Sequence, residues 1–145
     1  MGTSRRFPAA IIAAIDDSKI LGIRAGARSA HRFVGIWAVV VDRRVFARSW
    51  TLKAGGWYRT LLEDPAGTLE VGQRRLRFRA ARVRSERILA AVEDAYAEKY
   101  STPGALKYVR GFRTARRRAT TLEFVPPESR RQAPARPVAT RRAAR

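Results

Sequence analysis

FVGIWAVVVDRRVFARSW, residues 33–50, is the stretch that most constrains the fold. Residues 33–41 are apolar and rich in β-branched side chains, but the run is too short for a buried helix, so it predicts a strand buried on both faces. Residues 42–44 predict a turn, and residues 45–50 predict a returning strand that pairs with the first. The turn contains no glycine, which leaves its type open.

The rest of the chain predicts further strands and helices. In residues 76–83, Leu76, Phe78 and Ala80 alternate with arginines, as in a half-buried strand. Residues 85–100 have apolar side chains at helical spacing, and Ser85 is a suitable N-cap. The remaining predicted strands are 20–24, 68–71 and 120–125, and the remaining helices are 8–15, 57–63 and a short piece at 106–109. Because this order is not βαβ alternation, the sequence predicts a mainly β fold, a six-stranded antiparallel barrel with flanking helices.

The composition indicates one domain with a basic surface. The 145 residues include 31 Lys and Arg against 12 Asp and Glu, a formal net charge of +19. Residues 1–126 predict a single domain, and residues 127–145, rich in Arg, Ala and Pro, predict a disordered tail. No cysteine is present and His31 is the only histidine, so we expect no disulfide and no metal site. No run approaches the roughly 18 apolar residues of a membrane span, and we expect a cytoplasmic protein.

Residues 46–64, FARSWTLKAGGWYRTLLED, combine features of a phosphate site. Gly55 and Gly56 allow close backbone approach, and a helix that starts at Trp57 presents unpaired N–H groups. Strand alternation puts Arg48 and Ser49 on opposite faces, so both meet one ligand only at a bulge or a subunit boundary. The candidate phosphate ligands are Arg48, Ser49, Lys53 and Arg59, and the candidate flat walls for a ring are Trp37, Trp50, Trp57 and Tyr58.

The same residues also fit a purely structural role. Basic side chains beside aromatic rings often form a solvated face with cation–π contacts. In that interpretation Trp57 and Tyr58 only anchor a short helix to the barrel. His31 lies in a basic loop, where the first interpretation is an exposed residue and the alternative is a proton donor.

Three segments resemble the split β-barrel superfamily of pyridoxamine-phosphate-oxidase-like flavin proteins: IWAVVVDRRVFARSW, GGWYRTLLEDPAGTLEVGQRRLRFRAARV and SERILAAVEDAYAEKY. Over residues 10–126 the likeness is greatest to an uncharacterised family of small proteins related to the deazaflavin-dependent nitroreductases. Those nitroreductases have a WYxNLxxNP element. Residues 57–65, WYRTLLEDP, are similar to it, with Thr60 and Asp64 in place of its two asparagines.

The resemblance implies a split β-barrel that forms a homodimer and binds FMN or the 8-hydroxy-5-deazaflavin coenzyme at the barrel edge or the dimer interface. It implies a hydride-transfer oxidoreductase, similar to the nitroreductases. It also implies that the coenzyme phosphate contacts Arg48, Ser49, Lys53 and Arg59, and that the ring or the substrate contacts Trp57 and Tyr58.

Two other classes of function remain open. A non-enzymatic protein could contact nucleic acid without sequence preference through its arginines, because clustered positive charge attracts phosphates. The third alternative is a barrel that has lost its cofactor, since fold does not settle function. The arginines in question lie in the predicted tail and at positions 75, 77, 79, 110, 113 and 116–118.

Overall fold

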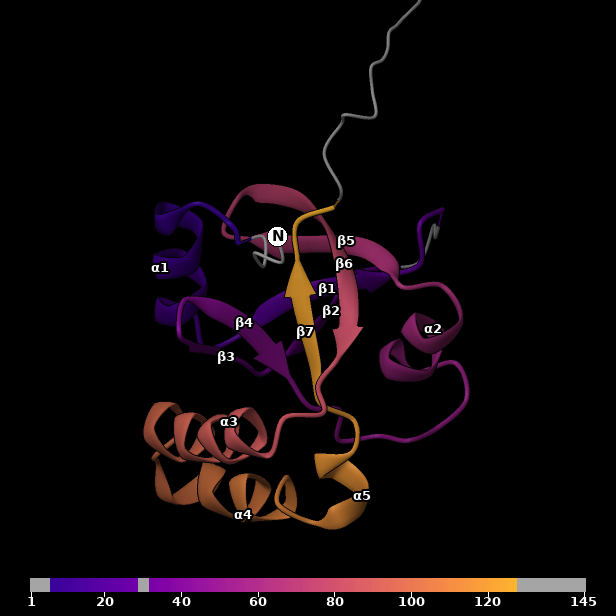
Figure 1. The fold of residues 1–145 in the computed structure, drawn as a ribbon. Helices are drawn as coiled ribbons and strands as arrows, with labels where there is room; N and C mark the ends of the chain where they lie inside the picture. The colour runs from indigo at the N-terminus through magenta and orange to yellow at the C-terminus, as the bar shows by residue number, and fades with distance from the viewer. Residues whose placement is uncertain (1–5, 29–31, 128–145) are drawn as a thin grey trace, which may run out of the picture.

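The computed structural model of the chain describes residues 6–28 and 32–127. These residues form one seven-stranded antiparallel sheet with the strand order β2-β1-β5-β6-β7-β4-β3. The sheet curls into a nearly closed barrel (Figure 1), which confirms the predicted fold class. The strands are β1 (Leu21–Ala25), β2 (Val34–Ile36), β3 (Ala38–Val41), β4 (Arg44–Ala47), β5 (Ala66–Val71), β6 (Arg74–Arg82) and β7 (Leu122–Val125).

The seventh strand arises because the predicted strand 33–41 is interrupted at Trp37. The carbonyl oxygen of Trp37 accepts a hydrogen bond from the Tyr96 hydroxyl at 2.6 Å, and the chain passes there from one edge of the sheet to the other. The prediction of burial on both faces is wrong for the first half of this run, since Val34 is 50% exposed. The second half, β3, is in contact with both α1 and α3, which cover it.

The β3–β4 hairpin closes with a two-residue turn. Val41 pairs with Arg44, and Asp42 and Arg43 have φ angles of 54° and 61°. Two consecutive left-handed residues define a type I′ turn, whose twist matches that of the flanking strands. The expected glycine is absent, so the hairpin forms in spite of an unfavourable Arg43 backbone.

Within residues 6–28 and 32–127, five helices flank the barrel. The predicted helix 57–63 is confirmed, as is the Ser85 cap, whose Oγ accepts a hydrogen bond from the Ile88 N–H at 3.3 Å. The helix predicted at 106–109 is longer because Pro103 occupies its first turn, where proline is tolerated. The helices are α1 (Ala9–Asp17), α2 (Trp57–Glu63), α3 (Glu86–Lys99), α4 (Pro103–Gly111) and α5 (Ala115–Arg118).

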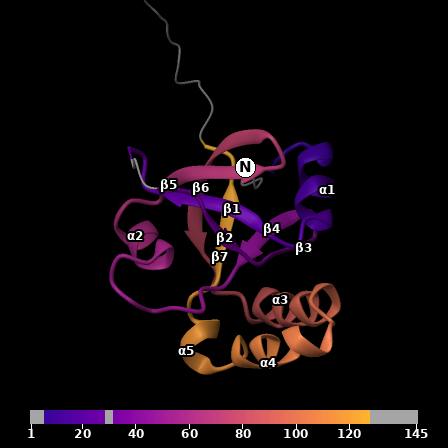
Figure 2. The same ribbon diagram turned by 180° about the vertical axis from the view of Figure 1, so that it is seen from behind.

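Two apolar clusters hold these elements together. One fills the barrel beneath α1 and α2 and includes Ile15, Leu69 and Phe124. The other lies between the β3–β4 hairpin and the pair α3–α4, and includes Phe46 and Val92. Figure 2 shows the helices from behind, with α3, α4 and α5 together at the end of the barrel away from α1.

Two sequence predictions lie outside the described residues. These are the role of His31 and, from residue 128 on, the disordered tail. In the part of the chain that the structure does describe, no helix combines the length and the apolarity needed to cross a membrane.

Candidate functional site

A cavity of about 560 Å³ opens between the barrel, the segment 50–56 and helix α4. Its walls are mainly apolar, and none of the described residues that line it is acidic. Ligand pockets have volumes of about 300–1,000 Å³ and similar walls. The lining residues are Ile20, Val34, Gly35, Ile36, Trp37, Arg48, Trp50, Thr51, Gly55, Gly56, Trp57, Tyr108 and Phe112.

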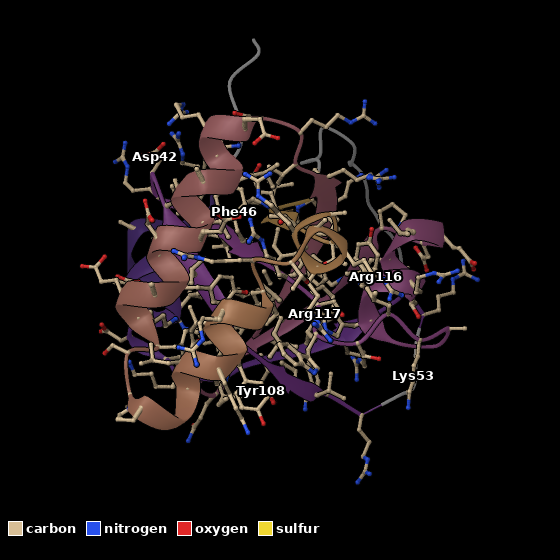
Figure 3. The ribbon with its side chains drawn as sticks, turned by 90° about the horizontal axis from the view of Figure 1, so that it is seen from below. Asp42, Phe46, Lys53, Tyr108, Arg116 and Arg117 are labelled. Carbon is tan, nitrogen blue, oxygen red and sulfur yellow. The ribbon has the colours of Figure 1, made fainter. Side chains whose placement is uncertain are left out.

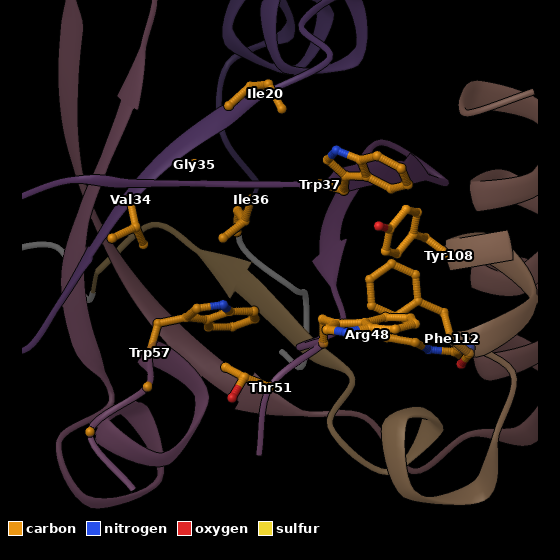
Figure 4. Close-up of a pocket in the computed structure, with 13 residues that line it drawn as sticks. Ile20, Val34, Gly35, Ile36, Trp37, Arg48, Thr51, Trp57, Tyr108 and Phe112 are labelled. Atoms are coloured by element: carbon orange, nitrogen blue, oxygen red, sulfur yellow. The ribbon is translucent and has the colours of Figure 1, made fainter. Parts of the chain in front are cut away.

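Trp57 forms one side of this cavity. It is the first residue of α2, and its ring lies across the cavity from Tyr108 and Phe112 (Figure 4). Its ring packs edge-on against Phe124 of the barrel interior, with the centroids 6.1 Å apart. Because Phe124 is fully buried, this wall is anchored to the core of the barrel.

The opposite side is an aromatic cluster at helix α4 and at the break between β2 and β3. Trp37 stacks on Tyr100 with the centroids 4.2 Å apart and meets Tyr108 edge-on at 6.0 Å. Trp37 was a candidate from its sequence position, whereas Tyr108 and Phe112 were not predicted. These two are four residues apart on and next to a helix, a spacing that predicts a shared face but not what the face contacts.

Arg48, a predicted phosphate ligand, is buried and bound to the protein itself. Its Nε donates to Oγ1 of Thr121 at 2.7 Å, and its Nη2 donates to the Leu89 carbonyl at 2.9 Å. Its Nη1 donates to the Phe112 carbonyl at 3.0 Å and to the Glu93 carboxylate at 3.2 Å. Burial lowers the pKa of Arg48, and the charge of Glu93 opposes that shift. The guanidinium therefore ties β4 to α3, α4 and β7.

Ser49 and Tyr58, two further predicted site residues, are also buried. The Ser49 hydroxyl donates to the Thr51 carbonyl at 2.5 Å, and its backbone N–H donates to Oγ1 of Thr120 at 2.8 Å. The Tyr58 hydroxyl donates to the Ala119 carbonyl at 3.5 Å. Both residues fix the walls of the cavity from behind.

Lys53 and Arg59, by contrast, are exposed beside the cavity. Lys53 begins a turn in which its carbonyl accepts from the Gly56 N–H at 3.1 Å, and Gly55 has a φ of +87°. Arg59 reaches back to the Leu52 carbonyl, with an Nη1–O distance of 3.4 Å. In Figure 3, which views the molecule from below, Lys53 lies at one side and Tyr108 lies nearer the middle. Of the six predicted site residues, Arg48 and Trp57 thus line the cavity, Lys53 and Arg59 are exposed beside it, and Ser49 and Tyr58 are buried without lining it.

Asp64, which replaces an asparagine of the nitroreductase element, has a structural role. Its Oδ2 accepts from the Ala27 N–H at 2.9 Å, which joins the end of α2 to the loop after β1. Asp64 does not line the cavity. Its negative charge is therefore directed at the loop.

The arginines named for nucleic-acid binding divide into two groups. Arg118 is engaged, since it binds Glu86 and shares Glu93 with Arg48. Arg77 and Arg79 are exposed on β6. Nucleic-acid binding stays a prediction, for which salt-dependent affinity is the test.

Acidic and histidine side chains do not gather anywhere in the described residues in a group of three or more that could hold a metal ion. The cavity instead offers flat apolar walls and a basic rim. Such a site can bind and orient an organic ligand.

Fold and cavity together define a small antiparallel barrel with an aromatic site between the barrel and a helix. The chain belongs to the family of uncharacterised proteins conserved in bacteria called DUF2255, whose model matches residues 10–124. No curated protein matches the chain.

Two solved structures are similar to this one. The conserved hypothetical protein Rv2991 from Mycobacterium tuberculosis is 16% identical, with a TM-score of 0.52 over 84% of this chain and 83% of that chain. A FAD-binding protein, mll6688, from Mesorhizobium loti is 14% identical, with a TM-score of 0.47 over 83% of this chain and 88% of that chain. At 16% identity, the first likeness shows the fold alone.

Proposed function

We propose that this protein binds FMN or the 8-hydroxy-5-deazaflavin coenzyme in the cavity and acts as a hydride-transfer oxidoreductase. The observation that carries the proposal is the cavity itself, about 560 Å³ in volume, with aromatic side chains on two opposite sides. Flat ring systems bind against such walls through offset or edge contacts, which contribute about 0.5–1.5 kcal/mol per aromatic pair beyond burial. The resemblance to flavin proteins in the sequence supports the same ligand.

Trp57 is the residue that we assign to the coenzyme ring. It lies across the cavity from Tyr108, and Phe124 holds its ring from the barrel side. Because its ring packs on Phe124, Trp57 offers an anchored edge of the site. A bound flavin or deazaflavin supplies the hydride-transfer chemistry, and the protein orients it and excludes water.

Lys53 and Arg59 are the residues that we assign to the coenzyme phosphate. Both flank the turn at Gly55 and Gly56, where the absence of side chains lets a phosphate approach the backbone. Lysine contributes a point charge and arginine a planar pair of donors. Arg48, Ser49 and Tyr58 act indirectly in this proposal, because their polar atoms hold the cavity walls.

The test is a titration of the protein with FMN and with the deazaflavin coenzyme, in which quenching of tryptophan fluorescence measures binding. The double variant Lys53→Ala/Arg59→Ala is expected to weaken binding at least about tenfold, since hydrogen bonds to charged groups contribute about 1.5–3 kcal/mol each. The control is Arg74→Ala/Arg84→Ala, which removes the same charge from exposed positions outside the cavity. Equal losses in both double variants would contradict a specific phosphate site.

The homodimer implied by the resemblance stays a prediction as well. Sedimentation of the purified protein across a range of concentrations tests it. A monomer at all concentrations would leave the cavity as a site formed by one chain.

A further inference from the structure

The indole of Trp50 is held on several sides although 41% of the residue is exposed. The guanidinium of Arg117 lies 3.7 Å from the ring centroid, and the Arg117 Nε donates to the Trp50 carbonyl at 2.9 Å. Tyr108 and Phe112 meet the indole edge-on, with centroid distances of 5.1 and 5.6 Å. Trp50 is therefore a part of the cavity wall that neighbouring side chains hold in place.

Gly111 allows helix α4 to come this close to the indole. A Cβ atom added at Gly111 would lie 2.5 Å from two atoms of the Trp50 ring, well inside van der Waals contact. Any larger residue must push the indole away from α4. The position of Trp50 thus depends on two residues that do not line the cavity, Gly111 and Arg117.

The charges around this end of the cavity are positive. Arg117 covers the Trp50 ring, and the Lys107 ammonium lies 5.2 Å from the centroid of Tyr108. These cations already use the negative ring faces that would attract a cationic ligand. Among the described residues, none of those lining the cavity is acidic. The local field therefore favours an anion and opposes a cation.

We infer that the α4 end of the cavity, formed by Trp37, Trp50, Tyr108 and Phe112, is a subsite for a planar aromatic carboxylate. Arg117 is a positioning residue in this subsite, because it fixes the indole that forms the wall. The inference rests on the proposed function in one respect, since the carboxylate would be the substrate that reacts with the coenzyme bound at Trp57. Binding of the carboxylate itself needs no coenzyme.

The test uses two probes, naphthoate and naphthamide, which share a flat ring system and differ in charge. Isothermal titration of the coenzyme-free protein is expected to show naphthoate binding at least about threefold more tightly than naphthamide, the range of an exposed charge pair. Equal affinities, or no binding of either probe, would overturn the inference.

Two variants distinguish the effect of the Arg117–Trp50 contact from the effect of losing a positive charge. Arg117→Gln is expected to weaken naphthoate binding about twofold to fivefold and to increase acrylamide quenching of tryptophan, because Trp50 loses its clamp. Arg116→Gln is the matched control, because Arg116 is the exposed neighbour on the same helix and loses the same charge (Figure 3). Equal effects of the two variants would overturn the role of Arg117.

Gly111→Ala tests the geometry without changing charge. It is expected to weaken both probes at least about tenfold, because the displaced indole enters the cavity. Circular dichroism checks that the variant folds, and Gly104→Ala on the same helix is the control, since a Cβ there meets nothing within 4 Å.

If naphthoate binds and FMN does not, the coenzyme proposal fails alone. If FMN binds and naphthoate does not, or if the two compete for one site, this inference fails alone.

Discussion

Arg48 and Glu93 form an ion pair behind the cavity wall, with an N–O distance of 3.2 Å. The Arg48 side chain is 0% exposed and that of Glu93 is 19% exposed. Arg118 binds the same carboxylate oxygen from the other side. Glu93 of α3 thus forms ion pairs with two arginines, one at the end of β4 and one in α5. Arg48, which had the strongest sequence case for a ligand contact, is thus buried and paired within the protein, and it also lines the cavity.

Arg48→Lys is therefore expected to destabilise the fold by about 1–3 kcal/mol, the cost of leaving buried hydrogen-bond acceptors unpaired. Lysine cannot replace the donors that now reach Leu89, Phe112 and Thr121 together. Urea unfolding measures the change. Arg87→Lys is the control, because the Arg87–Asp42 pair is exposed, and less than about 1 kcal/mol is expected there. A loss at Arg48 as small as the control would mean that the buried network contributes little.

Arg43→Gly is expected to stabilise the protein by about 0.5–1 kcal/mol. Arg43 has a φ of 61°, and a left-handed backbone costs an L-residue about 1–2 kcal/mol, partly offset by the greater chain entropy of glycine. The converse variant is Gly72→Ala in the β5–β6 turn, where φ is +60° and a Cβ meets nothing within 4 Å. That variant is expected to lower the melting temperature. If Arg43→Gly also lowers it, the type I′ turn is not the strained element described above.

Two buried tyrosines predict a loss of stability at alkaline pH. Burial raises the pKa of Tyr96 and of Tyr100 above the usual value, so the folded protein keeps both protons where the unfolded chain releases them. Their contribution is complete below about pH 10 and decreases as pH rises above that value. Burial lowers the pKa of Lys99, so the folded protein releases this proton at a lower pH than the unfolded chain does. The contribution of Lys99 to stability therefore increases as pH approaches about 10.4.

Tyr96→Phe isolates the tyrosine contribution, because Lys99 is present in both proteins. At about pH 9 the variant is expected to be about 1–3 kcal/mol less stable, since the Arg48 N–H loses its acceptor. Between about pH 9 and pH 11 the variant is then expected to lose less stability than the parent protein. Parallel stability curves in urea would contradict the assignment to Tyr96.

Local patterns predicted the elements of this fold, and long-range contacts decided what the patterns could not. The alternation of Leu76 and Phe78 with arginines was sufficient for β6, and Ser85 for the start of α3. The break at Trp37 depends on Tyr96, which lies 59 residues further along the chain. Strand periodicity could not predict it.

The candidate site shows the same limit. The glycine pair, Lys53 and Trp57 are adjacent in sequence, so their association was visible without a structure. The acceptors of Arg48 lie 41 to 73 residues away, and an arginine next to tryptophan looks the same in sequence whether it is buried or exposed. Tyr108 and Phe112 join the cavity only because α4 packs beside Trp50.

The melting temperature of the protein with saturating FMN, with saturating deazaflavin coenzyme and with neither is the most direct test of the central claim, a coenzyme in the cavity. A ligand at a hundredfold excess over its Kd stabilises a protein by about 2.7 kcal/mol. The account predicts a rise in melting temperature with at least one coenzyme, and loss of that rise in Trp57→Leu. An unchanged melting temperature with both coenzymes would contradict it.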